Sequence, residues 1–234
     1  MARPVCIRKP SAPRRSGRAL GHFTRMSVAK ENKGLLLSCT PEVLDPILVP
    51  LGFRRSPRSL VYSRDFPGAT HEFVLSFDSS PRYAPQARMH LVPAVSIRMP
   101  EVARTALQMT GDQFRFGGSD VIIGHQTQNL APNSEHRRWF VSDATSCRLA
   151  LEDIAVFFPR WVEPFLRDCT SPDDLLRQYE AGDKRPIQQH HLFLFVAACY
   201  FLRGQRARAA QVLDTHSGKP GLRKIYARAF DSVA

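Results

Sequence analysis

The chain has 234 residues with a hydrophobic fraction of 43%, which is sufficient for a hydrophobic core without disulfides or metals. Its longest apolar run, HLFLFVAACYFL (191–202), is far shorter than the roughly 20 residues that a membrane-spanning helix needs, so we exclude such a helix. The net charge of +12 would suit a nucleic-acid partner, but seven of the basic residues lie in the first 25. The other 209 residues therefore carry only +5.

The first 25 residues contain no acidic residue and show no hydrophobic periodicity. They fit a basic arm for nucleic acid or anionic lipid, a transit peptide, or a segment that precedes a natural start at Met26. We expect them to be disordered in each case. The predicted divisions are a disordered basic tail (1–34), an α+β domain (35–183) and a helical C-terminal appendage (184–234).

The first predicted helix begins at TPE (40–42), where a threonine N-cap precedes a proline and an acid. Pro46 and Pro50 limit it to about two or three turns. Two strands follow, RSLVYSR (58–64) and HEFVLSFD (71–78), and the second alternates apolar and polar residues. A Pro-Gly turn signal joins them, so we expect an antiparallel hairpin.

A third strand is predicted over 88–99, which shows the same alternation. Pro93 interrupts it and cannot donate a backbone hydrogen bond, so we expect an edge position or a bulge there. A short helix over 100–111 follows. The segment 113–124 predicts one bent strand or two short ones, and RRWFVSD (137–143) predicts the last strand, after a polar loop.

From Cys147 onward the apolar residues recur at intervals of three and four, which is typical of a helix. Pro159 should kink or split this helix. SPDD (171–174) begins another helix with a serine N-cap and a proline at its first position, and this helix should stop near Gly182.

The next predicted helix, over 186–202, is apolar on nearly every side and should be buried. Gly204 separates it from a partner helix over 206–213, and 222–230 predicts a last one. The region 58–98 lacks the helices that a parallel sheet needs between its strands. We therefore predict an α+β fold, with an antiparallel sheet of about four to six strands packed by helices and a C-terminal helical hairpin.

The helix ending in LGFRR, followed by SLVYSR, resembles the start of a bacterial family of domains of unknown function. The likeness continues at AVSIRMPEV, LALEDIAVFFPRWVEPFL and TSPDDLLRQYE, and covers residues 40–181. Some relatives are similar to immunity proteins that neutralise bacterial toxins, so the resemblance implies a protein-binding role. The basic charge of this chain departs from the acidic character common in proteins that block basic nuclease toxins.

AACYFLRGQRARAAQVLD (197–214) resembles one helical hairpin of the tetratricopeptide type. Such repeats need about three units to stand alone. The resemblance therefore implies that this hairpin caps the main domain.

Candidate binding residues lie in two places. Glu72 in the second strand, and His90 and Arg98 in the third, occupy alternate positions on one face of each strand. If the two faces coincide, an acid, an imidazole and a guanidinium could meet, which is material for acid–base chemistry. A solvated face with cross-strand ion pairs is the alternative. Arg206 and Arg208 belong to a cationic C-terminal cluster that could contact phosphates.

No motif predicts catalysis, a metal or a cofactor. The eight histidines lack metal-ligand spacing, and neither a nucleophile elbow nor a phosphate-binding loop is present. The five scattered cysteines have no C-x-x-C pair, as expected for free thiols in a reducing cytoplasm. We expect a cytoplasmic, non-enzymatic protein-interaction domain. The alternatives are a domain that binds nucleic acid or anionic surfaces and, second, an enzyme of unrecognised type.

Overall fold

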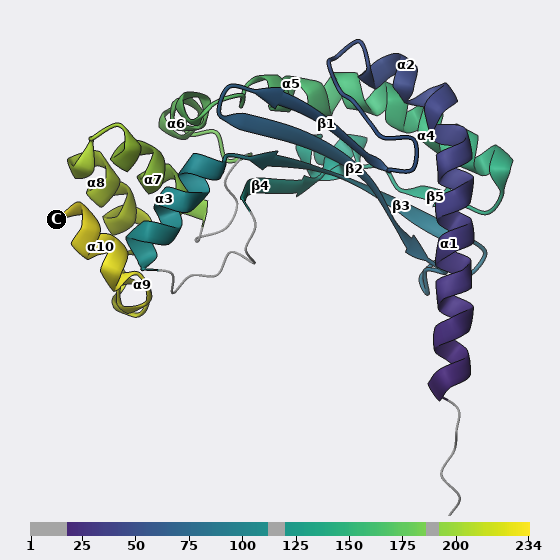
Figure 1. The fold of residues 1–234 in the computed structure, drawn as a ribbon, viewed down its shortest axis with the longest axis horizontal. Coiled ribbons are helices and arrows are strands. Elements are labelled where there is room, and N and C mark those ends of the chain that lie inside the picture. Colours follow the sequence, from purple (N-terminus) through teal and green to yellow (C-terminus); the bar gives the residue numbers. More distant parts are fainter. Residues whose placement is uncertain (1–17, 112–119, 186–191) are drawn as a thin grey trace, which may run out of the picture.

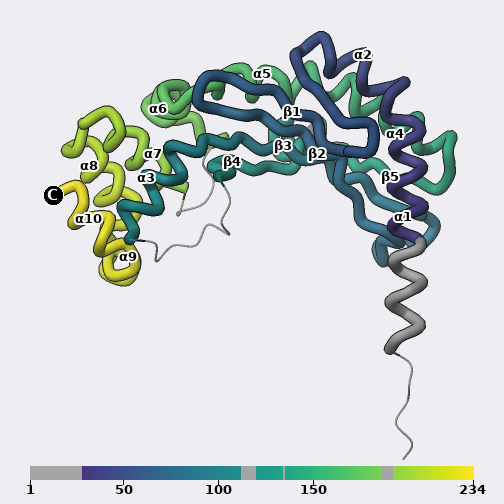
Figure 2. Tube along the Cα trace, in the orientation of Figure 1, coloured from purple at the N-terminus to yellow at the C-terminus, as the bar shows by residue number. Residues whose placement is uncertain are grey.

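The computed structural model describes residues 18–111, 120–185 and 192–234 (Figures 1 and 2). Those residues form a five-stranded antiparallel sheet, helices on one of its faces, and a group of helices at the C-terminus. The predicted α+β class is therefore confirmed. The predictions that concern other parts of the chain, including the tail before Arg18, lie outside the described residues.

The sheet begins with the predicted hairpin. Strand β1 (Val61–Phe66) pairs antiparallel with β2 (Ala69–Ser79). The turn between them contains Gly68, whose φ of 90° lies in the region that favours glycine. Buried and partly exposed residues alternate along both strands, with Phe73 and Leu75 fully in the core.

Strand β3 (Met89–Arg98) lies in the centre of the sheet. It pairs with β2 on one side, and with both β4 (Val121–Gln126) and β5 (Trp139–Val141) on the other. The strand expected over 137–143 is confirmed. The edge position or bulge expected at Pro93 is wrong, because this residue lies in a central strand and pairs regularly with β2.

A local gap accommodates this proline. The pairing of β4 with β3 ends at Ala94, and that of β5 ends at Leu91. The carbonyl of Pro93 accepts a hydrogen bond from Thr127 Oγ1 (3.2 Å) on this side of β3. The nitrogen and the carbonyl of one strand residue point to the same side of the strand. The nitrogen of Pro93 therefore faces the gap, and the lack of an N–H there costs the sheet no hydrogen bond between strands.

One face of the sheet is covered by helical segments that follow one another without a loop. Helix α4 (Ala144–Phe157) passes through a π-helical turn (Phe158–Val162) into α5 (Glu163–Arg167), so the split predicted at Pro159 is confirmed. Aromatic rings join this run to the sheet. The ring of Phe158, for example, lies 5.1 Å from that of Phe73 in an edge-to-face arrangement.

At the N-terminal end, two predictions are corrected. Helix α1 (Arg18–Val43) occupies much of the tail that we expected to be disordered over residues 1–34, and short α2 (Asp45–Leu48) follows it. Thr40 does not begin a helix; it lies buried inside α1, where its hydroxyl donates to the Leu36 carbonyl (2.6 Å). A helix-interior threonine commonly makes this bond, so the residue type alone could not identify a start.

The C-terminal part is a group of helices. The hairpin that we predicted is present, with buried α7 and its partner α8 separated by Gly204. The helix expected to start at SPDD is α6, and Ser171 caps it by accepting from the Asp174 amide. The bounds are α6 (Pro172–Glu180), α7 (Phe193–Leu202), α8 (Arg206–Ser217), α9 (Pro220–Ile225) and α10 (Ala227–Val233).

Helix α3 (Pro100–Thr110) connects this group to the sheet, since it follows β3 directly and packs against α7 and α10. It ends as predicted at Gly111, which has a left-handed φ of 62°. Arg228 of α10 donates to the Gly111 carbonyl (3.2 Å), and its side chain occupies the space that a Cβ at this position would need. In the described ranges, every helix is too short or too polar to cross a bilayer.

Candidate functional site

The second face of the sheet carries the candidate site, and we call it the open face. Its side chains are defined by the strand register: the residues at 61, 63 and 65 of β1, the even-numbered residues of β2 from Thr70 to Asp78, and those of β3 from His90 to Arg98. Of these, only His90 is buried, whereas the even-numbered residues of β1 and the odd-numbered residues of β2 and β3 face the core. In Figure 1, α2, α4 and α5 lie along the opposite face.

A charged cluster occupies one end of the open face. Glu72 and Ser96 are cross-strand partners, and the Ser96 hydroxyl donates to Glu72 Oε2 (3.0 Å). Arg98 Nε forms an ion pair with Glu72 Oε1 (3.1 Å), and the same guanidinium also pairs with Asp120. Burial alone would lower the pKa of Arg98, but the two carboxylates outweigh it and raise the pKa. The guanidinium is thus held charged between two acids.

His90 lies at the other end of the same face, opposite Asp78. Eight residues separate it from Arg98, which corresponds to about 27 Å along a strand. The acid, imidazole and guanidinium therefore do not meet in one site. The imidazole is instead hydrogen-bonded to Tyr83 (2.6 Å from Nδ1) and lies 4.8 Å from the Phe140 ring. Burial lowers the pKa of His90, which favours the neutral imidazole.

Between these two ends the open face is mainly apolar. Val61, Val74 and Ala94 form one row across the three strands, and Val92 follows Ala94 on the same face of β3; all four are partly exposed. Ser76 lies opposite Val92, and its hydroxyl donates to the Val92 carbonyl. Tyr83 extends this surface beyond His90 and is 60% exposed. The strip is therefore a largely apolar centre between polar ends.

The charges around this strip are of both signs. Four acids are accompanied by Arg98 and by Arg138, which lies near His90 and whose charge helps to lower the pKa of His90. Asp65 and Asp78 are exposed on the open face, and Glu72 and Asp120 share the single guanidinium of Arg98. This local acidity contrasts with the net charge of +12 of the whole chain. Sequence reasoning missed Asp120 and Phe140, because they enter the site through long-range strand pairing. It also missed Tyr83, which reaches His90 from the segment between β2 and β3.

The predicted residues Arg206 and Arg208 lie in a different place, on α8. Arg208 Nη1 donates to Glu180 Oε1 (2.6 Å), and its guanidinium lies 5.7 Å from the ring centre of Tyr200. The Arg206 guanidinium lies 5.5 Å from the ring centre of Phe201. The five candidate residues thus lie in three places: Glu72 with Arg98, His90 at the other end of the open face, and Arg206 with Arg208 on α8. Their roles in binding stay predictions.

Three arginines of the basic C-terminal cluster form ion pairs within the protein. Besides Arg208, Arg203 pairs with Asp173, and Arg223 pairs with Asp214 at 2.8 Å. These contacts leave less positive charge for a phosphate backbone than the sequence suggests. They weaken the case for nucleic-acid binding through these helices.

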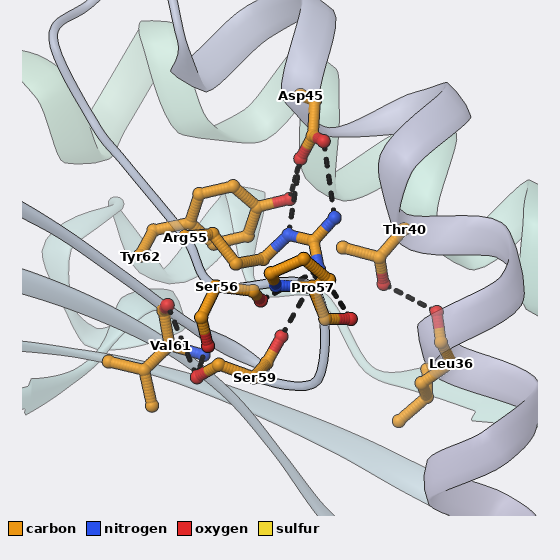
Figure 3. Close-up of polar contacts among 9 residues, drawn as sticks. All are labelled: Leu36, Thr40, Asp45, Arg55, Ser56, Pro57, Ser59, Val61 and Tyr62. Atoms are coloured by element: carbon orange, nitrogen blue, oxygen red, sulfur yellow. Dashed lines mark hydrogen bonds and ion pairs between the residues drawn. The ribbon is translucent and has the colours of Figure 1, made fainter.

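The LGFRR segment, which carries the family resemblance, has a structural role (Figure 3). Asp45 at the start of α2 accepts hydrogen bonds from the Tyr62 hydroxyl (2.5 Å) and from Arg55 Nη2 (3.1 Å). The Arg55 side chain is 7% exposed and ties α2 to β1. Gly52 supplies a φ of 87°, and Phe53 is buried in the core. These side chains do not line either of the cavities found beside helix α6.

Comparisons with protein-family models, with curated proteins and with solved structures give no match for this chain. Within the described part of the chain, no cluster of histidine, cysteine or acidic side chains could hold a metal ion. The resemblance to a family of immunity-like domains stays a prediction. The geometry of the open face is the remaining basis for a functional conclusion.

Proposed function

We propose that the protein is a non-enzymatic protein-binding domain and that the open face contacts its partner. The observation that carries this proposal is the pattern of the open face: an apolar strip of partly exposed side chains, bounded at both ends by polar and charged groups. Protein interfaces have the same anatomy, an apolar centre within a polar rim. The opposite face of the sheet is already occupied by the core.

The charges indicate the chemistry of the partner. Carboxylates at both ends of the strip favour a surface that combines apolar with basic residues. This local acidity also bears on the likeness to immunity proteins. The net charge of the chain argues against recognition of a basic toxin, but the open face by itself is suited to a basic partner.

The test compares two charge-matched double variants. In Asp65→Lys/Asp78→Lys the open face loses two exposed carboxylates, whereas Glu152→Lys/Asp231→Lys makes the same charge change at exposed positions elsewhere. Immobilised wild type and both variants are exposed to native lysate at 200 mM salt. We expect the open-face variant to retain the wild-type partner at least tenfold less, since close charge pairs steer and stabilise such complexes, and the control to retain it fully.

Equal retention by both variants would contradict the proposal. Loss of the captured material after nuclease treatment would support nucleic-acid binding instead.

A further inference from the structure

A second candidate site lies between α6, α7 and α8, away from the open face. It is a cavity of about 400 Å³ whose walls include Tyr179, Glu180, Tyr200, Arg208 and Thr215. A volume of this size is sufficient for a small ligand. Its walls combine two aromatic rings with one carboxylate and one guanidinium. None of these side chains belongs to the open face of the sheet.

The carboxylate and the guanidinium are arranged side by side. Glu180 Oε1 accepts both the Tyr200 hydroxyl (2.7 Å) and Arg208 Nη1 (2.6 Å). Tyr200 is 3% exposed, so its hydroxyl fixes the carboxylate from the protein interior. The side chains of Arg208 and Glu180 are 59% and 48% exposed. Oε2 of Glu180 and the remaining guanidinium donors of Arg208 are therefore accessible to another molecule.

This arrangement favours a ligand that carries both charges. A simple anion is attracted by Arg208 but repelled by Glu180, and a simple cation experiences the reverse. A zwitterion satisfies both groups, since its ammonium can donate to Glu180 and its carboxylate can accept from the guanidinium in the paired geometry that arginine offers. Tyr179 and Val212 provide the apolar part of the wall.

We propose that this cavity binds a free α-amino acid, with the ammonium on Glu180 and the carboxylate on Arg208. The test is isothermal titration calorimetry of the full chain with the twenty L-amino acids, each at up to 10 mM. We expect at least one to bind. The decarboxylated and the deaminated analogues of the best ligand should each bind at least tenfold more weakly, since each loses one of the ligand's two ionic contacts.

Variants locate the site. Arg208→Gln and Glu180→Gln should each weaken binding at least tenfold. Arg223→Gln is the control, because it removes an exposed ion pair of the same helical group, Arg223–Asp214, outside the cavity. Circular dichroism verifies that each variant is folded. NMR titration of the wild type should shift the amide signal of Thr215 and leave the open face unchanged.

The absence of binding by every amino acid would overturn the proposal. Equal binding of the single-charge analogues, full affinity in Arg208→Gln, or shifts confined to other parts of the protein would do the same. The outcome is independent of the open face, so this proposal and the protein-binding function can fail separately.

Discussion

His71 in β2 is a fully buried polar residue beneath the covering helices. Its Nε2 lies 2.7 Å from the Cys169 carbonyl, and Arg64 Nε donates to its Nδ1 (3.3 Å). Because arginine can only donate, Nδ1 must be unprotonated, and Nε2 carries the hydrogen that Cys169 accepts. Arg64 also pairs with Glu163 at 2.9 Å. The imidazole thus links the sheet to the chain after α5 in its neutral form.

This network predicts a dependence of stability on pH. Burial lowers the pKa of His71 to about 4, below the value near 6.5 of an unfolded histidine. The unfolded chain therefore binds the extra proton first, so the contribution of His71 is complete above pH 6.5 and declines as the pH falls toward 4. Urea denaturation should show a loss of about 2 kcal/mol between pH 7 and pH 5 from this residue alone.

The measurement needs a variant that cannot titrate. His71→Gln should be less stable than the wild type at pH 7, and the difference between the two proteins should narrow by about the same 2 kcal/mol at pH 5. Other acids contribute equally to both proteins and cancel. A difference that stays constant over this range would show that His71 is not neutralised by burial.

Among the elements, helix α1 departs most from the prediction, because residues up to 34 were expected to be disordered. Asn32 in α1 is fully buried and donates to Ser79 Oγ (3.1 Å), and it is also hydrogen-bonded to the Arg88 side chain. Glu31 forms an ion pair with Arg88 at 2.9 Å. Together with buried Leu36, these contacts join α1 to the end of the β2–β3 hairpin. The helix is therefore an integral part of the folded domain.

Truncation tests this role. A chain that begins at Met26 retains every α1 contact named above, whereas one that begins at Leu35 loses Asn32 and its hydrogen bonds to the partly buried Ser79 and Arg88. We expect the shorter chain to be about 2–4 kcal/mol less stable in urea denaturation, and Asn32→Ala to lose about 1–3 kcal/mol. Equal denaturation midpoints for the two truncated chains would refute an integral role for the start of α1.

The elements that the sequence predicted well are those with strong local signals. Alternation and a Pro-Gly turn identified the β1–β2 hairpin, and the serine N-cap identified α6. The errors arose where distant contacts override local rules. Pro93 is tolerated in a central strand because two other strands leave a gap beside it. Helix α1 as a whole has no marked apolar stripe, and tertiary contacts from Asn32 onward hold it.

At the scale of the molecule, the two faces of the sheet have different roles. One face forms the core with α4 and α5, while the other faces away from these helices (Figure 1). Alternation in the sequence placed Glu72 and Arg98 on this outer face. It could not show that Asp120 completes the cluster, because the register between β3 and β4 shifts by a bulge next to Arg98.

The central claim is that the open face is the surface that binds a partner. Carbodiimide labelling of carboxylates, read by mass spectrometry in the free protein and in the complex with the captured partner, tests it most directly. We predict that exposed Asp65 and Asp78 are labelled in the free protein and protected in the complex, while Glu152 and Asp231 stay labelled in both. Undiminished labelling of Asp65 and Asp78 in the complex would contradict the claim.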